Sequence, residues 1–574
     1  MARTRPVLHR LARALMLGAA LALPLHVPLV RAQDNPQVRL PALGESAAED
    51  FNVGTERRLG DQIMGEIRRD PDYLDEPQLL EYLQSLWQPL VDAARARGDI
   101  DVDTGKQFAW EAFLVRDRSV NAFALPGGYV GVHLGLISMT ATRDELASVL
   151  AHELTHITQR HIARGIANQS RSTLLGVAGM ILAILAASRS NNADMAQAAI
   201  MGGQAAAVQG QLNFSRDMER EADRIGYAVL GLAGFDPAGM AGMFGKLDLA
   251  NRLNDNGAYP YLRSHPLTLE RQSEARLRAQ GVVGGDSARS PWMHALMGAR
   301  ARVLMDTSVL ALRRLQEQPG PRVGHGPADR LAALYASSMA SSLLRDHALA
   351  EQQGAAARQL LAAQPSPEPA VQRALWLLDA EGRLAAGDRA GALKVLAQVQ
   401  QRWAAVGSAR PVLMIQAHAA LQLQGDGRVD ALRHATEALQ AWVTGEPRDA
   451  LAWLLLGNTA EAMGLRLRAL RAHAESRLLV GDLAGAIDRL RAGRTLARTT
   501  AMGQDFIEAS IVESRLRELE AQRRQLAMEA RGARGGGARD PGREPPGDRS
   551  EDGEARRPQV QSGVVAATAS IGAR

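Results

Sequence analysis

Cysteine is absent from the 574 residues of this chain, lysine occurs only three times, and aromatic residues make up 4% of the composition. Without cysteine the chain can form no disulfide, although export would permit one, and it offers no attachment point for a lipoprotein anchor. Its basic residues are almost all arginine, which we interpret as coding bias and not as phosphate recognition.

The charge balance gives no indication of a nucleic-acid-binding protein. The formal net charge is +5, but the first 32 residues contain five arginines and no acidic residue. The rest of the chain has 62 basic and 62 acidic residues and is therefore formally neutral. A neutral protein has no general electrostatic attraction for a phosphate backbone.

Residues 1–32 have the pattern of a secretory signal peptide. Arginines precede and enter an apolar run over 15–25, and "LVRA" then places small residues at Val30 and Ala32. The run is shorter than the ~20 residues of a membrane span, so we predict cleavage after Ala32. A retained anchor, which would hold the protein at a membrane, is the alternative.

The remaining length is too great for a single core, and its pattern changes near residue 290. Residues 33–290 mix helical periodicity with strand-like runs at 108–117 and 121–137, which predicts a first, mixed domain. Within it, the apolar segment 174–187 is shorter than a membrane span and is predicted to be a buried or interfacial helix. The Gly- and Ala-rich segment 193–210 has the composition of a mobile lid.

Residues 291–528 contain no strand-like run and are predicted to form an α-helical repeat domain. "LAAGDRAGAL" (384–393) recurs as "LLVGDLAGAI" (478–487), and Trp453, Leu456 and Gly457 have the spacing typical of a tetratricopeptide repeat. The interval from Pro447 to Gly481 matches the period of about 34 residues of that repeat. A plain helical bundle is the alternative. Residues 529–574 are rich in Gly, Pro and mixed charge, which predicts a disordered tail.

The stretch "SVLAHELTHITQRH" (148–161) carries the strongest chemical motif. Thr142 and Glu145 form a capping box at the start of a predicted helix that runs through residue 168. His152 and His156 are then one turn apart on one face, where both imidazoles can bind the same Zn²⁺. Glu153 would accept a proton from a water molecule whose pKa zinc lowers towards about 7. A polar patch on an ordinary helix is the alternative.

A catalytic zinc needs a third protein ligand, and two places in the sequence were considered for it. Position 162 is Ile162, and His161 would point away from the metal-facing side of a continuous helix, as a residue behind the ligands or in solvent. A later helix offers Glu219 and Asp223, four residues apart on one face. We therefore predict Glu219 as the ligand, with Glu221 as the competitor. Asp223 would orient a histidine ligand or assist proton transfer.

Four motifs together resemble the M48 family of zinc metallopeptidases: HELTH (152–156), NAFALPGGYV (121–130), EREADRIG (219–226) and SHPLTLER (264–271). The resemblance implies a mainly α, gluzincin-like metallopeptidase domain with a small β-sheet, followed here by the helical repeat domain. It further implies that His152, His156 and Glu219 bind one zinc ion per chain, that Glu153 is the catalytic base, and that Asp223 is a proton donor.

The strand before the zinc helix is a candidate for substrate binding. Pro126-Gly127-Gly128 predicts a turn, and the residues after it read as a short strand. An edge strand beside the metal could pair with an extended peptide, while a core strand is the alternative. The resemblance favours the first interpretation, so the predicted substrate-binding residues are Tyr129, Val130, Gly131 and Val132.

His265 lies just before Pro266, at a predicted junction between loop and helix. Two interpretations of it are open: a helix-cap or surface residue, or a fourth, regulatory zinc ligand that keeps the enzyme latent.

The order of signal peptide, peptidase domain and repeats resembles an exported branch of the family. This implies a periplasmic enzyme that degrades misassembled outer-membrane β-barrel proteins or assists their assembly, and whose repeats bind the barrel assembly machinery. A chaperone or adaptor with a latent or structural metal site is the alternative. A peptidoglycan enzyme has no supporting motif.

Overall fold

The computed structural model describes residues 52–167, 215–253, 260–280, 291–317, 326–499 and 506–535. The signal-peptide prediction and the expectations for 174–187 and 193–210 lie outside these residues. Among the helices within them, none is both long enough and apolar enough to cross a membrane.

The described part of the chain is mainly helical and contains one four-stranded sheet, as predicted. The strands are β1 (Tyr73–Leu74), β2 (Glu111–Val115), β3 (Ala122–Leu125) and β4 (Tyr129–His133). Their spatial order is β1-β2-β4-β3. Strand β4 pairs in parallel with β2 and antiparallel with β3, so that β3 and β1 form the two edges.

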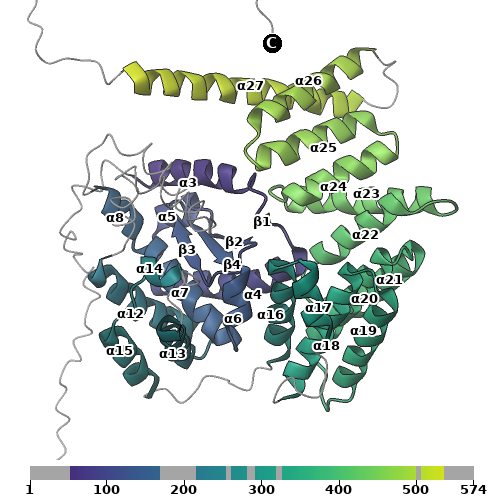
Figure 1. The fold of residues 1–574 in the computed structure, drawn as a ribbon. Helices are drawn as coiled ribbons and strands as arrows, with labels where there is room; N and C mark the ends of the chain where they lie inside the picture. The colour runs from purple at the N-terminus through teal and green to yellow at the C-terminus, as the bar shows by residue number, and fades with distance from the viewer. Residues whose placement is uncertain are drawn as a thin grey trace, which may run out of the picture. The chain divides into compact units, whose positions relative to one another are not determined.

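Alternating residues of the sheet bury side chains on opposite faces, as the period of two along a strand requires. In β2, Phe113 and Val115 pack against α3 (Val53–Ile67), whereas Ala112 and Leu114 belong to the main core with α4 (Pro77–Arg97) and α7 (Arg143–Thr158). The sheet therefore lies between α3 on one side and α4 and α7 on the other (Figure 1). The turn from β3 to β4 uses Gly127 and Gly128 at φ of 76° and 92°, values that favour glycine.

Several further helices complete the surroundings of the zinc helix α7. They are α5 (Val102–Gln107), α6 (Leu134–Met139), α8 (His161–Ala167), α12 (Arg216–Leu232), α13 (Ala238–Leu253), α14 (Tyr261–Ser264) and α15 (Leu269–Gln280). Helices α12 and α13 both pack on α7, and α15 packs on α13. Because α7 is covered by helices and by the sheet, its polar side chains at 152, 153 and 156 are buried.

The start of α7 follows the predicted capping box with one difference. The Thr142 hydroxyl accepts a hydrogen bond from the Glu145 amide at 3.2 Å. The Glu145 carboxylate in return accepts from the amide of Ala141, one residue before the N-cap, at 2.6 Å. Glu145 is also paired with Lys246 of α13 at 2.6 Å, which ties the beginning of the zinc helix to the helix that covers it.

The end of α7 differs from the prediction of one continuous helix through residue 168. Helix α7 stops at Thr158, and Arg160 adopts the left-handed conformation with φ of 50° before α8 begins at His161. Such a conformation is costly for a residue with a side chain. Arg160 is held there by an ion pair, at 2.9 Å, with Glu56, a buried carboxylate on α3.

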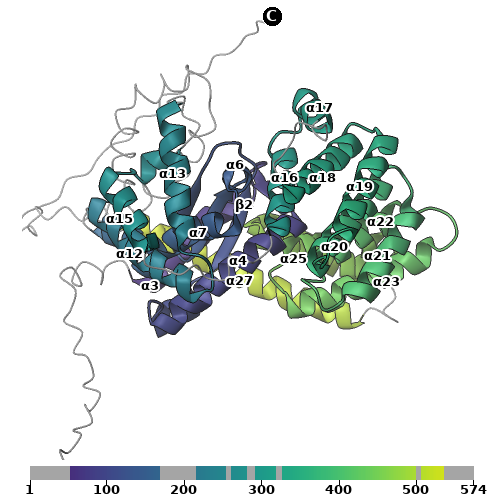
Figure 2. The same ribbon diagram turned by 90° about the horizontal axis from the view of Figure 1, so that it is seen from below.

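The described residues beyond 290 form consecutive helices. These are α16 (Trp292–Met305), α17 (Val309–Glu317), α18 (Pro327–Leu343), α19 (His347–Ala362), α20 (Pro369–Ala385), α21 (Arg389–Trp403), α22 (Arg410–Gln422), α23 (Arg428–Gly445), α24 (Ala450–Ala462), α25 (Arg466–Leu479) and α26 (Leu483–Thr499). Neighbours such as α18 and α19, or α20 and α21, pack side by side (Figure 2).

The repeated Gly-Asp pairs in this region are helix connections. Gly387 and Gly481 have φ of 86° and 80°, and the aspartates after them accept hydrogen bonds from the amides of Gly391 and Gly485 at 2.8 Å. Each pair thus ends one helix in a left-handed residue and caps the next. The similarity between 384–393 and 478–487 thus reflects a repeated helix–turn–helix unit. Its identity as a tetratricopeptide repeat stays a prediction.

Of the described residues, those up to Glu513 belong to one compact unit, and 514–535 belong to a second. Within the first unit, the main core runs without interruption from α4 and α7 to α18 and α20. Buried Arg300 of α16 joins the two regions by contacting Glu76 at the start of α4, at 2.8 Å, and Glu381 of α20, at 2.7 Å. A domain boundary near 290 therefore stays a prediction. Helix α27 (Phe506–Gly535) continues past 529, where the tail was expected to begin.

Candidate metal centre

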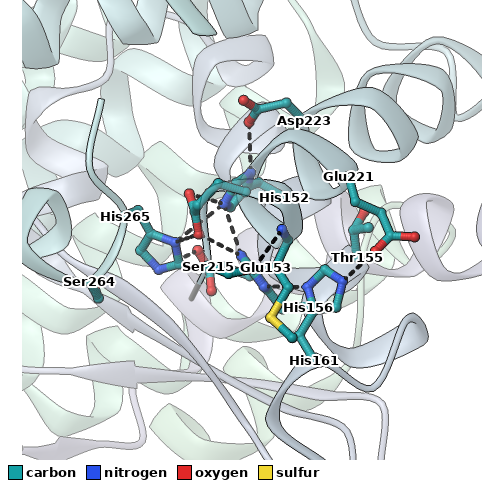
Figure 3. A network of polar contacts seen from close by, with 12 residues as sticks. His152, Glu153, Thr155, His156, His161, Ser215, Glu221, Asp223, Ser264 and His265 are labelled. Carbon is teal, nitrogen blue, oxygen red and sulfur yellow. Dashed lines mark hydrogen bonds and ion pairs between the residues drawn. The ribbon is translucent and has the colours of Figure 1, made fainter. Parts of the chain in front are cut away.

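Four buried side chains place their donor atoms within 4.8 Å of one another: His152, His156, Glu219 and His265. The first two lie on α7, and His265 is the C-terminal cap of α14 (Figure 3). Glu219 lies in the first turn of α12. Among the described residues, this is the one group of at least three such donors. The structure thus brings together the three predicted ligands and the residue considered as a fourth.

The spacing of these donors fits zinc. Ligand atoms at 2.0–2.1 Å from a tetrahedral zinc are separated by about 3.3 Å. The two Nε2 atoms of His152 and His156 are 3.0 Å apart. His152 Nε2 lies 3.5 Å from Glu219 Oε2, and His156 Nε2 lies 3.4 Å from Glu219 Oε1. His265 Nδ1 lies 3.3 Å from His152 Nε2 and 3.0 Å from Glu219 Oε1. All five separations are close to the tetrahedral value.

The electrostatics of the donor group match a site for a cation. Burial opposes the charged form of His152, but the Glu219 charge and a hydrogen bond with Asp223 raise its pKa to about 10. Burial lowers the pKa of His156 well below its usual value. Although burial acts against ionisation of Glu219, the nearby histidines hold its pKa far below the usual range. The group therefore contains one firmly ionised carboxylate.

Glu153 is fully buried beside these donors. Within the described residues, neither of its carboxylate oxygens makes a hydrogen bond of normal geometry, although the Ala124 backbone faces it from β3. Its nearest ionic neighbour is His265, whose Nε2 lies 3.5 Å from Glu153 Oε1. Burial raises the pKa of Glu153, which makes the carboxylate a stronger base than an exposed one. An unsatisfied buried acceptor calls for an explanation, and a bound ion or a water molecule beside it is one such explanation.

Asp223 contacts a ligand from behind. Its Oδ1 lies 3.0 Å from His152 Nδ1, the nitrogen that faces away from the other donors. Arg271 of α15 donates to both oxygens of Asp223, at 2.6 and 2.8 Å, and contacts Glu219 Oε2 at 2.7 Å. Burial would raise the pKa of Asp223, but the hydrogen bonds from Arg271 and His152 keep it below the usual value. Sequence reasoning did not assign Arg271, although it closes the SHPLTLER motif.

His161 and Glu221 contact the site from the other side. His161 Nδ1 is 2.8 Å from His156 Nδ1, and His161 Nε2 is 3.0 Å from Glu221 Oε2. The prediction that His161 points away from the metal-facing side rested on one continuous helix through residue 168. The break at Arg160 returns the ring to His156. Glu221 is not among the clustered donors, and burial lowers the pKa of His161 to about 4.

The prediction of an edge strand at 129–133 is wrong. Strand β4 is paired on both sides, and the edge that packs on α7 is β3. Tyr129, Val130 and Val132 are buried, and Gly131 lies under the Phe123 ring, where any side chain would collide. The backbone of these four residues is occupied by the sheet, so they cannot pair with a peptide. The predicted substrate-binding residues are therefore core residues.

The comparisons with known proteins agree with this site. Residues 78–279 match the family model described as peptidase family M48. A "Beta-barrel assembly-enhancing protease" of Yersinia pestis is 31% identical over 478 residues, which cover 83% of this chain and 91% of that protein. A protein of the same name from Escherichia coli is 38% identical over 240 residues. That second match covers 42% of this chain and about half (47%) of the relative.

The matched segment contains His152, Glu153, His156, Glu219, and His265, and the Yersinia match extends through most of the helical region. The predictions of the family resemblance and of a zinc metalloprotease are thereby confirmed. This chain belongs to peptidase family M48.

Proposed function

We propose that this chain is an exported zinc endopeptidase that acts on misassembled outer-membrane β-barrel proteins in the periplasm. The observation that supports the peptidase activity most strongly is the buried Glu153 carboxylate, which makes no hydrogen bond of normal geometry to the described residues, beside a compact group of four possible metal ligands. The names of the relatives support the role in barrel assembly. Export rests on the expectation that residues 1–32 are a signal peptide cleaved near Ala32.

The residues have distinct roles in this proposal. His152, His156 and Glu219 hold zinc, which when bound supplies a Lewis acid that activates water at neutral pH. Glu153 accepts the proton of the attacking water and delivers it to the leaving amine. Asp223 orients His152 through Nδ1, because an ionised carboxylate held by Arg271 has no proton to give. We therefore assign Asp223 an orienting role in place of the proton-donor role expected from the family resemblance.

Strand β3 is the surface that we propose for the substrate backbone. The His133 amide donates to the Asn121 carbonyl. Because hydrogen-bonded and non-bonded residue pairs alternate along antiparallel strands, residues 121, 123 and 125 are the ones whose peptide groups face β4. The peptide groups of Ala122 and Ala124 consequently point away from β4, towards α7. An extended peptide that pairs with these groups would pass directly beside Glu153.

His265 gives the enzyme a means of remaining latent. Its Nδ1 lies at tetrahedral spacing from His152 and Glu219, while its Nε2 faces Glu153. The ring thus fills the place that a catalytic zinc keeps open for water. We propose that α14 and the loop after it must move before a substrate is cut, in a two-state equilibrium.

Replacing His265 by alanine should raise basal proteolysis without loss of zinc. If the open state is ~0.1–10% populated, the increase is on the order of 10- to 1,000-fold. The measurement is cleavage of an unfolded protein by zinc-loaded enzyme, with Ser264→Ala, at the last residue of α14, as the neighbouring control. A His265→Ala protein that is fully zinc-loaded but inactive would show that this histidine assists the chemistry instead of blocking it.

The helical region contains a groove that we propose as the binding surface for a partner in the cell envelope. The groove has a volume of about 610 Å³ between the start of α4 and helices α20 and α22. Its lining combines the apolar side chains of Leu384, Met414 and Ile415 with Gln78, whose buried Oε1 makes no hydrogen bond to the described residues. An extended segment of an outer-membrane protein or of its assembly machinery can place apolar side chains against this lining and donate a backbone hydrogen bond to Gln78 Oε1.

Filling the groove should separate partner binding from catalysis. Ala385→Trp places a large ring at its exposed rim and should abolish rescue of outer-membrane assembly defects in cells, while short-peptide cleavage stays within about twofold. Ala441→Trp, on exposed α23 away from the groove, is the matched control. Full rescue by Ala385→Trp would show that partners bind elsewhere.

The alternative function, a chaperone or adaptor with a latent metal site, is favoured by one observation, the position of His265 among the ligands. It predicts that the protein prevents aggregation of unfolded barrels equally well with and without a chelator, and that His265→Ala does not release peptide cleavage.

A further inference from the structure

The interaction of His161 with Glu221 has no part in the chemistry described so far. His161 is 1% exposed and contacts His156 from the side opposite the clustered donors. Glu221 is partly exposed and is also paired with Arg164 of α8 at 3.1 Å. A line of contacts thus leads from a zinc ligand through a buried imidazole to a carboxylate near the surface (Figure 3).

The direction of each hydrogen bond in this line follows from the carboxylate. An ionised carboxylate can only accept, so His161 Nε2 must carry the proton in its contact with Glu221. A neutral imidazole with a proton on Nε2 has a lone pair on Nδ1. His161 Nδ1 therefore accepts from His156 Nδ1–H across 2.8 Å. The lone pair of His156 is then left on Nε2, the nitrogen that faces Glu219 and His152.

We propose that Glu221 and His161 are positioning residues that fix the tautomer of His156 for zinc binding. Asp223 orients His152 by direct contact with its Nδ1. Glu221 orients His156 in the same way, except that the His161 imidazole lies between the carboxylate and the ligand. The negative end of the line also makes the His156 nitrogen a better donor to a cation. This inference rests on the proposed zinc site and adds two residues to it.

The break after α7 is what makes the arrangement possible. In a continuous helix, His161 would lie about 140° around the axis from His156, because each residue turns the helix by about 100°. The left-handed Arg160, held by Glu56, brings the first residue of α8 back against the ligand. The Glu56–Arg160 ion pair is therefore part of the same support.

The test compares zinc affinity in the full-length protein, by competition with a chromogenic chelator. Glu221→Ala and His161→Phe should each weaken zinc binding by about 10- to 100-fold. Asp217→Asn is the matched control, because this carboxylate is on the same helix, is exposed and, among the described residues, pairs with Arg220 and with no residue of the metal centre. Thermal unfolding of the metal-free proteins shows whether a variant has simply lost its fold.

A second measurement begins with the wild-type protein and therefore gives a result even if no variant folds. Nitrogen-15 spectra of the histidine rings in zinc-loaded wild-type protein should show His161 protonated on Nε2 and His156 protonated on Nδ1. In Glu221→Ala, the His161 proton should become distributed between the two nitrogens. A proton on His161 Nδ1 in the wild type, or unchanged zinc affinity in a folded Glu221→Ala protein, would overturn the proposal.

These outcomes distinguish a failure of the proposed role of His161 and Glu221 from a failure of the proposed zinc peptidase function. A wild-type protein that binds no zinc would contradict the proposed metallopeptidase itself. A wild-type protein that binds zinc and cleaves substrate, while Glu221→Ala retains full affinity, would contradict only the role of His161 and Glu221.

Discussion

Replacing Glu153 by glutamine should reduce peptide hydrolysis by about 10²- to 10⁴-fold, the usual contribution of a general base. Glutamine has the same shape but cannot accept the proton of the attacking water. Zinc content should be unchanged, because Glu153 is not among the clustered donors. Because neither carboxylate oxygen makes a hydrogen bond of normal geometry to the described residues, the substitution should leave the free energy of unfolding largely unchanged.

The measurement is kcat/KM on an unfolded substrate with elemental analysis of the same sample. The His265→Ala background is the better host for it, because latency would otherwise hide the difference. A matched control is Glu145→Gln on the same helix, which contacts Ala141 and Lys246 but no zinc ligand. Wild-type turnover in the zinc-loaded Glu153→Gln protein would remove Glu153 from the role of base.

Replacing Glu219 by alanine should have the largest effect on the metal itself. Glu219 is the only carboxylate in the donor group, and it neutralises part of the charge of a bound cation. Its loss should weaken zinc affinity by more than about 100-fold, beyond the 10- to 100-fold typical of residues behind the ligands. Zinc per chain should therefore fall far below one after dialysis against a mild chelator.

Comparison with Glu221→Ala gives this prediction its control. Glu221 is two residues away on the same helix but reaches the site only through His161. The Glu221→Ala substitution should reduce zinc affinity measurably, but less than Glu219→Ala does. Equal zinc content in the two variants under the same chelator would show that Glu219 is not a direct ligand.

The part of the site that follows helical geometry could be predicted from the sequence. His152 and His156 share a face because they are four residues apart, and so do Glu219 and Asp223. Their relative positions in the structure agree with that periodicity, and the pairing of Asp223 with His152 follows from it. The Gly-Asp turns of the helical region were equally visible, because capping and left-handed glycine depend on adjacent residues.

What could not be predicted depends on contacts between distant segments. Arg160 ends α7 because Glu56, 104 residues away, holds its side chain, and nothing local in "THITQRHI" indicates a break. Strand β4 is interior because β2 pairs in parallel along its other side, a partnership that an alternating pattern does not reveal. The edge strand that packs on α7, β3, is only four residues long.

The most direct test of the central claim is zinc-dependent cleavage of an unfolded outer-membrane β-barrel protein by the purified His265→Ala enzyme. Proteolysis should disappear when zinc is removed by a chelator and should return on addition of about one equivalent of zinc per chain, in line with a single four-donor site. Cleavage that persists in the metal-free protein, or a fully zinc-loaded enzyme that leaves the unfolded barrel intact, would contradict the account.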